Sequence, residues 1–361
     1  QQKIRDKVVA FNGHVIISNF DSNNSQESIF PISTKQDFYP EFKTVEGIKH
    51  IQAVATKFGV IRTETDFEGV VLKGVGADYS WDYFKDFLLE GKLPDYTGKR
   101  NEEVLMSEYI ANRLKFKLGD TFQMIFAKDD PEKLPNIITY TIVGIYNSGF
   151  QDFDATYVIG DIRHLQRINN WGSDQVGSFE VFVDDYNQLQ EKGIEIYHNT
   201  PSTFNTQTIS EKYVSIFEWI KIFDKNIYAI IAIMILVAGI NMITALLVLI
   251  LERTQMIGIL KALGSNNWSI RKLFLYNASY LIVLGLFWGN LIGLGLLFAQ
   301  KYFKLFPLDP SVYYVSEAPV YINFGYILAL NICTLLLCLI MLLVPSYVIT
   351  KISPVKAIRF E

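Results

Sequence analysis

Hydrophobic and polar residues are distributed differently in the two parts of the chain. Three uncharged apolar runs, residues 227–251, 274–299 and 326–349, are each long enough to cross a bilayer as a helix. Before residue 227, shorter apolar segments alternate with polar turns, some with the two-residue period of strands and some with the spacing of amphipathic helices. The pattern therefore predicts a domain with its own core, followed by three membrane spans.

The first part is predicted to contain both strands and helices. Apolar residues in strand-like runs predict strands at 14–18, 58–62, 69–74, 121–127, 137–146, 178–183 and 194–197. Helical spacing or a capping residue predicts helices at 3–9, 48–55, 81–88, 107–114, 161–165 and 185–191. These elements do not follow the regular spacing of βαβ units, so an α+β fold is expected.

The order of these elements suggests that residues 1–207 form one domain with two lobes. Residues 1–74 and 176–207 are expected to form one lobe and residues 75–175 the other, and the Gly, Asn and Ser content at 147–149 and 169–177 indicates breaks there. Residues 208–226 are expected to form a stalk helix. Its apolar face consists of Ile209, Tyr213, Ile216, Phe217, Ile220 and Phe223. Residues 227–361 are the expected α-helical membrane domain.

The distribution of charge also distinguishes the two parts of the chain and predicts their orientation in the membrane. Residues 1–226 hold 24 basic and 33 acidic residues, whereas the rest of the chain holds 9 basic and 4 acidic residues. Because basic residues concentrate in the 252–272 loop and in the C-terminal tail, both are expected in the cytoplasm. Residues 1–226 and the 301–325 loop are then outside. The first residue is Gln1 rather than Met, so we expect a fourth, N-terminal span or a signal upstream.

Sequence patterns for catalysis are absent. No phosphate-binding G-x-x-x-x-G-K-[ST] pattern occurs, so ATP hydrolysis is not expected on this chain. The four histidines are scattered, and Cys333 and Cys338 both lie in the last apolar run, so neither a metal site nor a disulfide framework is expected. The acidic first part gives no support for nucleic-acid binding.

A short helical pattern lies between the first two apolar runs. Its apolar positions fall on one face of a helix: Met256, Ile259, Leu260 and Leu263. Gly264 is typical of a helix C-terminus, and charged pairs at 252–253 and 271–272 flank the pattern. One interpretation is a docking helix, and the other is an ordinary cytoplasmic loop.

The amino-acid sequence of this loop resembles a segment of one known family. Residues 252–264 read E-R-T-x-x-I-G-I-L-K-A-L-G, which is similar to the segment after the second span of ABC transporter permeases of the MacB/FtsX superfamily. The resemblance implies a coupling helix that seats in a partner ATPase. The implied contact residues are Glu252, Arg253, Met256, Ile257, Gly258, Ile259, Leu260, Lys261, Ala262, Leu263 and Gly264. The family usually has Glu where this chain has Met256, which puts a polar contact at that position in doubt.

Two segments of the first part resemble the same superfamily. One is residues 104–114, followed by Leu118-Gly119-Asp120, and the other is residues 143–150, followed by Asp154. Together with the loop, the similarity covers nearly the whole chain. It implies a MacB-like periplasmic domain followed by an FtsX-like transmembrane domain.

One hairpin points to a subfamily. The strands predicted at 121–127 and 137–146 are joined by nine residues that include two prolines. In lipoprotein-releasing permeases of the LolC/LolE type, which this chain resembles most, a protruding hairpin at this place hooks a periplasmic lipoprotein chaperone. The resemblance implies that role for Lys128, Asp129, Asp130, Pro131, Glu132, Lys133, Leu134 and Pro135. The alternative is a solvated, charged loop.

The resemblance implies a permease subunit that extracts lipoproteins from a bacterial inner membrane and hands them to the chaperone. A LolD-type ATPase would hold the ATP and Mg²⁺, and a second copy or a paralogue would be the second permease. A multi-pass protein with a large periplasmic domain is implied. The first alternatives are a MacB-like mechanotransmission efflux permease and an FtsX-like regulator of an outside hydrolase. The second is a membrane-anchored binding module without a motor.

The apolar runs contain a few features that suggest specific contacts. Gly285, Gly289 and Gly293 recur every four residues, which allows close helix packing. Polar residues within the runs, at Asn241, Thr244, Asn290 and Asn331, are expected to form hydrogen bonds with neighbouring helices. The runs contain no charge, which suits a lipid-modified substrate that contacts membrane lipid. A candidate substrate path is the face formed by Met234, Val237, Asn241 and Ala245.

Overall fold

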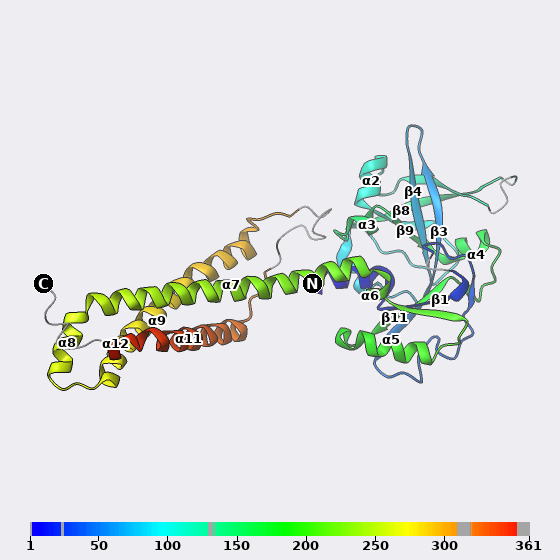
Figure 1. Ribbon diagram of the computed structural model, residues 1–361. Coiled ribbons are helices and arrows are strands. Elements are labelled where there is room, and N and C mark those ends of the chain that lie inside the picture. Colours follow the sequence, from blue (N-terminus) through cyan, green and yellow to red (C-terminus); the bar gives the residue numbers. More distant parts are fainter. Residues whose placement is uncertain are drawn as a thin grey trace. The chain divides into compact units, whose positions relative to one another are not determined.

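The computed structural model describes residues 2–22, 25–128, 132, 134–308, 318 and 320–351. The chain divides into two compact units, one built mainly from residues up to Phe217 and the other from Glu218 onward. Figure 1 shows that the first unit is built around a twisted sheet and that the second consists of helices. We call them the sheet domain and the helical unit.

Ten strands in the described part of the sheet domain form one mixed sheet in the order β12-β1-β11-β3-β4-β9-β6-β8-β5, with β7 pairing with β3 and β8. These strands are β1 Val15–Asn19, β3 Ile48–Arg62, β4 Phe67–Val75, β5 Leu88–Gly91, β6 Glu103–Ser107, β7 Thr121–Phe126, β8 Asn136–Tyr146, β9 Tyr157–Asp161, β11 Ser178–Val183 and β12 Phe204–Thr208. A separate pair consists of β2 Ile32–Ser33 and β10 Gln175–Val176.

Short helices accompany the sheet, and two begin at the residues that the sequence indicates. Ser107 Oγ accepts a hydrogen bond from the Ile110 amide, and an Asp161 carboxylate oxygen accepts one from the Arg163 amide. The helices are α1 Gln2–Asn12, α2 Glu108–Leu114, α3 Gln151–Asp154, α4 Ile162–Ile168, α5 Leu189–His198 and α6 Ile209–Lys212. The expected mixture of helices and strands is therefore confirmed.

The strands from the two predicted lobes occupy different halves of the sheet. Strands of residues 1–74 and 176–207 lie from β12 to β4, and strands of residues 75–175 lie from β9 to β5. The halves meet where β4 pairs with β9 in parallel and where β3 pairs with β7. Because one sheet runs through both halves, the division into lobes stays a prediction.

Three predicted elements are wrong. The expected helix at 48–55 is the first half of β3, where residues 51–55 are all buried because the strand is central and covered on both faces. The expected helix at 81–88 is two 3-10 turns, Trp81–Tyr83 and Lys85–Phe87, followed by β5. Pairing of β5 with β8 stabilises an extended conformation there, against the local helical spacing.

The third error is the strand expected at 194–197, which belongs to helix α5. Gly193 lies inside this helix and allows close packing. A Cβ at this position would lie 2.5 Å from Thr208 Cγ2, so the glycine lets the helix approach the end of β12. The helix expected at 185–191 begins as a 3-10 turn, Tyr186–Gln188, before α5.

In the described part of the chain, three helices are long and apolar enough to cross a membrane: Lys225–Glu252, Asn267–Phe303 and Phe324–Leu343. They belong to α7 Val214–Glu252, α9 Asn267–Phe303 and α11 Phe324–Ser346, and the short helices α8 Thr254–Ala262 and α12 Val348–Lys351 complete the unit. The three predicted spans are therefore confirmed by length and composition.

The helices of this unit share a small buried cluster. Its fully or nearly fully buried members are Leu246, Ile250, Ile257, Ile270, Phe274, Ala278, Ile282, Leu342 and Ile349. Further along, Asn290 of α9 and Asn331 of α11 exchange two side-chain hydrogen bonds, of 2.6 and 3.1 Å. The expected contact between neighbouring helices is thus confirmed for these two residues. Thr244 instead donates to the Ile240 carbonyl of its own helix.

Candidate functional site

The segment between the first two spans folds as the short helix α8, and its ends follow from the sequence. Gly264 has φ +89°, a left-handed conformation that ends the helix at little cost for a glycine. The Ser265 amide then donates to the Leu260 carbonyl at 3.0 Å. Asn266 Oδ1 accepts a hydrogen bond from the Ser269 amide and begins α9. The helix is therefore a separate, well-bounded element.

The two faces of α8 have different surroundings. Ile257 is fully buried in the cluster shared with the spans, and Gly258 is buried beside it. On the other side, Met256, Ile259 and Leu263 are 37%, 47% and 78% exposed. Helical spacing predicted this outward stripe, but it missed Ile257 as the inward anchor. Leu260, assigned to the stripe, is partly buried against the cluster, which corrects that assignment.

The remaining residues of the predicted coupling segment divide in the same way. Glu252, Arg253, Ala262 and Gly264 are exposed. The Lys261 ammonium donates to the Ile349 carbonyl at 2.7 Å and to the Thr350 carbonyl at 3.4 Å, and burial lowers the pKa of this lysine. An anchored helix that presents an apolar stripe is suited to docking against another protein.

The hairpin predicted to contact a chaperone lies on the sheet domain. Strands β7 and β8 pair from Thr121 with Thr141 to Phe126 with Asn136, so the connection between them is residues 127–135. Of the predicted contact residues, Asp129, Asp130, Pro131 and Lys133 lie outside the described residues. The others are exposed, namely Lys128, Glu132, Leu134 and Pro135. Leu134 is 84% exposed, so its side chain is accessible to a partner.

The predicted substrate path and the glycine repeat lie on exposed helix faces. Met234, Val237, Asn241 and Ala245 are all exposed, on the side of α7 that faces away from the buried Leu246 and Ile250. A Cβ added at Gly285, Gly289 or Gly293 would meet no atom within 4 Å in the described chain. The expected close packing at these glycines is therefore not made by the described chain.

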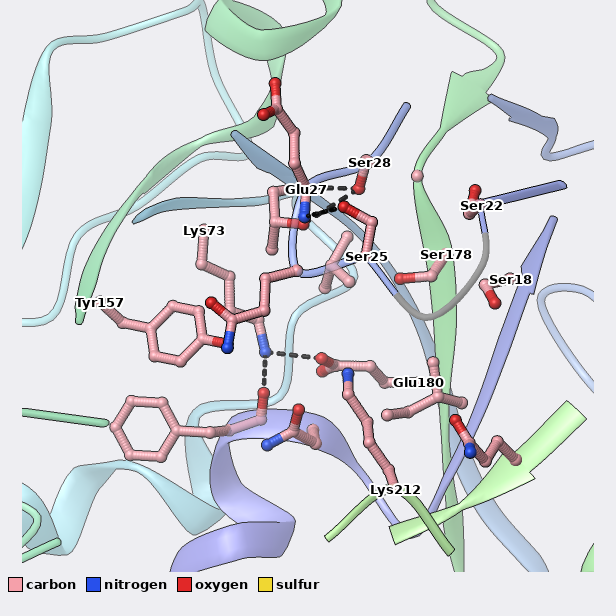
Figure 2. A pocket seen from close by; sticks show the side chains of 18 residues that line it. Ser18, Ser22, Ser25, Glu27, Ser28, Lys73, Tyr157, Ser178, Glu180 and Lys212 are labelled. Carbon is pink, nitrogen blue, oxygen red and sulfur yellow. Dashed lines mark hydrogen bonds and ion pairs between the residues drawn. The ribbon is translucent and has the colours of Figure 1, made fainter. Parts of the chain in front are cut away.

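The sheet domain contains a buried polar network that the sequence did not predict. Figure 2 shows Lys73 of β4 pointing toward Glu180 of β11. Lys73 Nζ donates to Glu180 Oε1 at 2.6 Å and to the Phe11 carbonyl, and Gln52 Nε2 donates to Glu180 Oε2 at 2.8 Å. Burial lowers the pKa of Lys73, and the charge of Glu180 offsets part of that effect. The sequence signal for this network is Lys73 itself, a single charged residue at an inward position of a mostly apolar strand.

This network is linked to the end of helix α1 and, through Asn12, to the residue between α6 and α7. The Phe11 carbonyl lies near the end of α1, and Asn12, the last residue of α1, accepts a hydrogen bond from the Tyr213 hydroxyl at 2.9 Å. Tyr213 stands between α6 and α7. Every polar group named in the network has a partner, so we interpret it as structural. In the described residues, no group of three or more His, Cys, Asp or Glu side chains could hold a metal ion.

Comparison with known proteins gives two family matches that together span most of the chain. The model of the MacB-like periplasmic core domain matches residues 2–194, and the model of the FtsX-like permease C-terminal region matches residues 228–354. Among solved structures, the periplasmic region of MacB from Actinobacillus actinomycetemcomitans is 16% identical with a TM-score of 0.37, and the match covers 60% of this chain and 98% of that one.

Two curated relatives align over nearly the whole chain. The lipoprotein-releasing system transmembrane protein LolC of Haemophilus influenzae is 23% identical over 353 residues, which is 92% of this chain and 82% of the relative. The uncharacterized ABC transporter permease YknZ of Bacillus subtilis is 20% identical over 354 residues, which is 94% of this chain and 81% of the relative. With the apolar helices, these matches indicate a membrane protein with an extracellular domain. The chain therefore belongs to the MacB/FtsX superfamily of ABC transporter permeases.

Proposed function

We propose that this permease extracts lipoproteins from the bacterial inner membrane and passes them to a periplasmic chaperone, driven by a LolD-type ATPase. ATP and Mg²⁺ would bind the ATPase, and a second permease, either a copy or a paralogue, would complete the complex. The observation that carries the proposal is the outward apolar stripe of α8, seated on a buried anchor at Ile257.

The stripe supports a motor-coupled permease because its side chains are exposed to a partner while the helix that carries them is packed against the spans. Ile259 and Leu263 are available to a partner, whereas Ile257 fixes the helix on the cluster formed by the spans. A push from a docked ATPase would therefore reach the spans instead of bending a flexible loop. A passive membrane anchor has no need of such an element.

Two observations support lipoproteins as the cargo. The 127–135 connection presents Leu134 to solvent, as a contact with a chaperone would require. The outward face of α7 at Met234, Val237, Asn241 and Ala245 is uncharged and exposed, so it could contact the acyl chains of a lipid-anchored protein and the surrounding lipid. The relative from Haemophilus influenzae is named for lipoprotein release.

The docking stripe can be tested by co-purification. The permease would be co-expressed with a LolD-type ATPase from the same organism, as wild type and with Ile259→Asp or Leu263→Asp. Both changes place a charge in the apolar contact, so the amount of ATPase recovered should fall at least about tenfold. Ser269→Asp is the control, since Ser269 is exposed in the first turn of α9 and lies outside the stripe. Equal recovery with all variants would refute docking through this face.

A MacB-like efflux permease is the second candidate, because YknZ aligns over 94% of this chain and its name specifies no lipoprotein. The hairpin distinguishes the two. Replacing residues 127–135 with a two-residue Asn-Gly turn should abolish capture of the periplasmic lipoprotein chaperone while the ATPase still co-purifies. Undiminished capture of the chaperone would remove the main support for lipoprotein release and favour the efflux permease.

A further inference from the structure

The end of the third span that lies beside α8 is interrupted. Helix α11 ends at Ser346, directly after Pro345, and α12 begins at Val348. Proline has no amide hydrogen to donate, and the last carbonyls of any helix lack partners within the helix. Carbonyl groups at this end therefore need donors from elsewhere in the molecule.

Two cationic side chains from other helices supply those donors. Lys261 of α8 donates to the carbonyls of Ile349 and Thr350, at 2.7 and 3.4 Å. Arg271 of α9 donates through Nε and Nη2 to Ser346 Oγ, at 3.1 and 3.0 Å, and its Nη2 lies 3.4 Å from the Leu343 carbonyl. Ser346 is fully buried and donates to that same carbonyl at 2.8 Å.

Apolar packing lies next to these hydrogen bonds. Ile257 of α8, Ile270 of α9 and Ile349 of α12 are at most 2% exposed and belong to one cluster. The hydrogen bonds from Lys261, and those from Arg271 to Ser346, are part-buried, and a charged donor makes them stronger than bonds between neutral groups. The polar and apolar contacts therefore fasten the same three helices together.

We infer that Lys261 and Arg271 are positioning residues that fasten α8 and α9 to the end of the third span, so that a displacement of α8 is delivered to the second and third spans together. The two amide hydrogen bonds between Asn290 and Asn331 hold the same two spans together further along. The transmission step rests on the proposed function, since it requires an ATPase that moves α8. The attachment of α8 and α9 to the end of the third span does not rest on the proposed function.

The fastening is tested on the permease alone in lipid nanodiscs by amide hydrogen exchange. Lys261→Met removes the ammonium but keeps an apolar side chain of similar length, so exchange in peptides from residues 341–351 should rise. Lys261→Arg keeps a cationic donor and should restore protection. Lys272→Met is the matched control, because Lys272 is exposed on the same part of α9 and its ammonium lies 5.8 Å over the Trp268 ring instead. Unchanged exchange in Lys261→Met would overturn the fastening.

Transmission is tested in the assembled complex. In proteoliposomes with the ATPase, Arg271→Met should still bind the ATPase and hydrolyse ATP, since Arg271 lies on α9 and the outward stripe of α8 is intact. Lipoprotein released per ATP should fall about tenfold, a change typical of losing one coupling between sites. Lys261→Met should lower the lipoprotein released per ATP in the same direction. Normal release per ATP together with raised exchange would overturn the transmission step.

A failure of the proposed function can be distinguished from a failure of the fastening. If wild-type permease bound no ATPase or released no lipoprotein, the proposed function would be refuted, while the exchange measurement on the permease alone would still decide the fastening. A variant that unfolded would be recognised because exchange would rise throughout α9 and not only in residues 341–351.

Discussion

In the sheet domain, the inward positions of the strands are filled by the chain itself, whereas in the helical unit most large apolar side chains point outward. Val15, Ile17 and Leu72 are fully buried, but Tyr228, Phe287 and Leu328, one from each span, are all more than half exposed. The chain thus encloses one core completely and leaves the other surface for lipid or for further subunits. Stability of the sheet domain is therefore a property of the single chain, and stability of the helical unit depends on its surroundings.

The two units also differ in the polar groups that they bury. The sheet domain buries a charged pair, Lys73 and Glu180, with further donors and acceptors around it. The helical unit pairs two neutral amides, Asn290 and Asn331. An ion pair inside a well-packed domain can be surrounded by fixed dipoles, whereas a charge at membrane depth has no such support. The comparison predicts larger effects for polar substitutions in the sheet domain than in the helical unit.

The largest effect is expected for Lys73→Met, which leaves the Glu180 carboxylate buried without its cation. Removing one partner of a buried pair typically lowers the free energy of unfolding by about 3–5 kcal/mol. Urea unfolding of the full chain in detergent, followed by pulse proteolysis of the sheet domain, would measure the change. Lys35→Met, which breaks the solvent-exposed pair with Asp174, is the control and should shift the midpoint far less.

A double substitution makes the Lys73 prediction sharper. Lys73→Met with Glu180→Leu removes both charges, so it should recover a large part of the lost stability. If the double variant were no more stable than Lys73→Met alone, the loss would come from packing and not from an unpaired charge.

The next largest effect is a pH dependence that arises from His14 of the sheet domain. Burial, together with the charges of Arg5 and Lys49, lowers the pKa of His14 from 6.5 to about 4, and Nδ1 accepts a hydrogen bond from the Val183 amide at 3.1 Å. Between these two pKa values the unfolded chain binds a proton that the folded chain does not. Stability should therefore be complete above pH 6.5 and fall as the pH is lowered toward 4, by about 3 kcal/mol in total.

Hydrogen exchange in β1 and β11 as a function of pH would measure this dependence. His14→Gln replaces the titrating ring with a neutral side chain, so it should flatten the change between pH 6.5 and 4. His164, whose pKa burial also lowers, contributes in the same direction and should leave a residual slope. A profile that is unchanged by His14→Gln would contradict the assignment.

A smaller effect is expected in the helical unit for Asn290→Leu. Hydrogen bonds between spans contribute about 0.6 kcal/mol on average and less than about 2 kcal/mol at most. Unfolding in mixed micelles should therefore show a modest loss, and Asn331→Leu should add little to it because the two amides pair with each other. Asn241→Leu is the matched control, since Asn241 is exposed on α7. A loss as large as that of Lys73→Met would contradict the comparison.

The smallest effect on the single chain is expected for Gly289→Ala, because an added Cβ meets no atom within 4 Å. Its unfolding should be nearly unchanged. Mutual capture of two differently tagged permeases should weaken if this face packs against a second subunit. Unchanged capture would assign the subunit contact to another face.

The sequence predicted those features that depend on nearby residues. Three uncharged runs identified the spans, and Ser107 and Asp161 identified two helix starts, because each signal is contained in a few neighbouring positions. The first half of β3 was predicted as a helix since Ile48, Ile51 and Ala55 have helical spacing. Its strand conformation is determined by pairing with β4 and β11, which lie elsewhere in the sequence.

The candidate site shows the same limit. The position and end of α8 could be read from residues 254–264, and so could its outward stripe. The inward anchor at Ile257 and the partners of Lys261 could not, because Ile349 and Thr350 come from the far end of the chain. The pairing of Lys73 with Glu180 also joins strands that are distant in sequence, so it required the sheet topology.

The central claim is that α8 lies on the opposite side of the membrane from the hairpin of the sheet domain. Single cysteines at Leu263 and Leu134, in a background with Cys333→Ser and Cys338→Ser, would be exposed to a membrane-impermeant maleimide in right-side-out and inverted vesicles. The account predicts that the cysteine at Leu134 reacts only in right-side-out vesicles and the cysteine at Leu263 only in inverted ones. Reaction of both from the same side would contradict it, since an ATPase in the cytoplasm could not then act through α8.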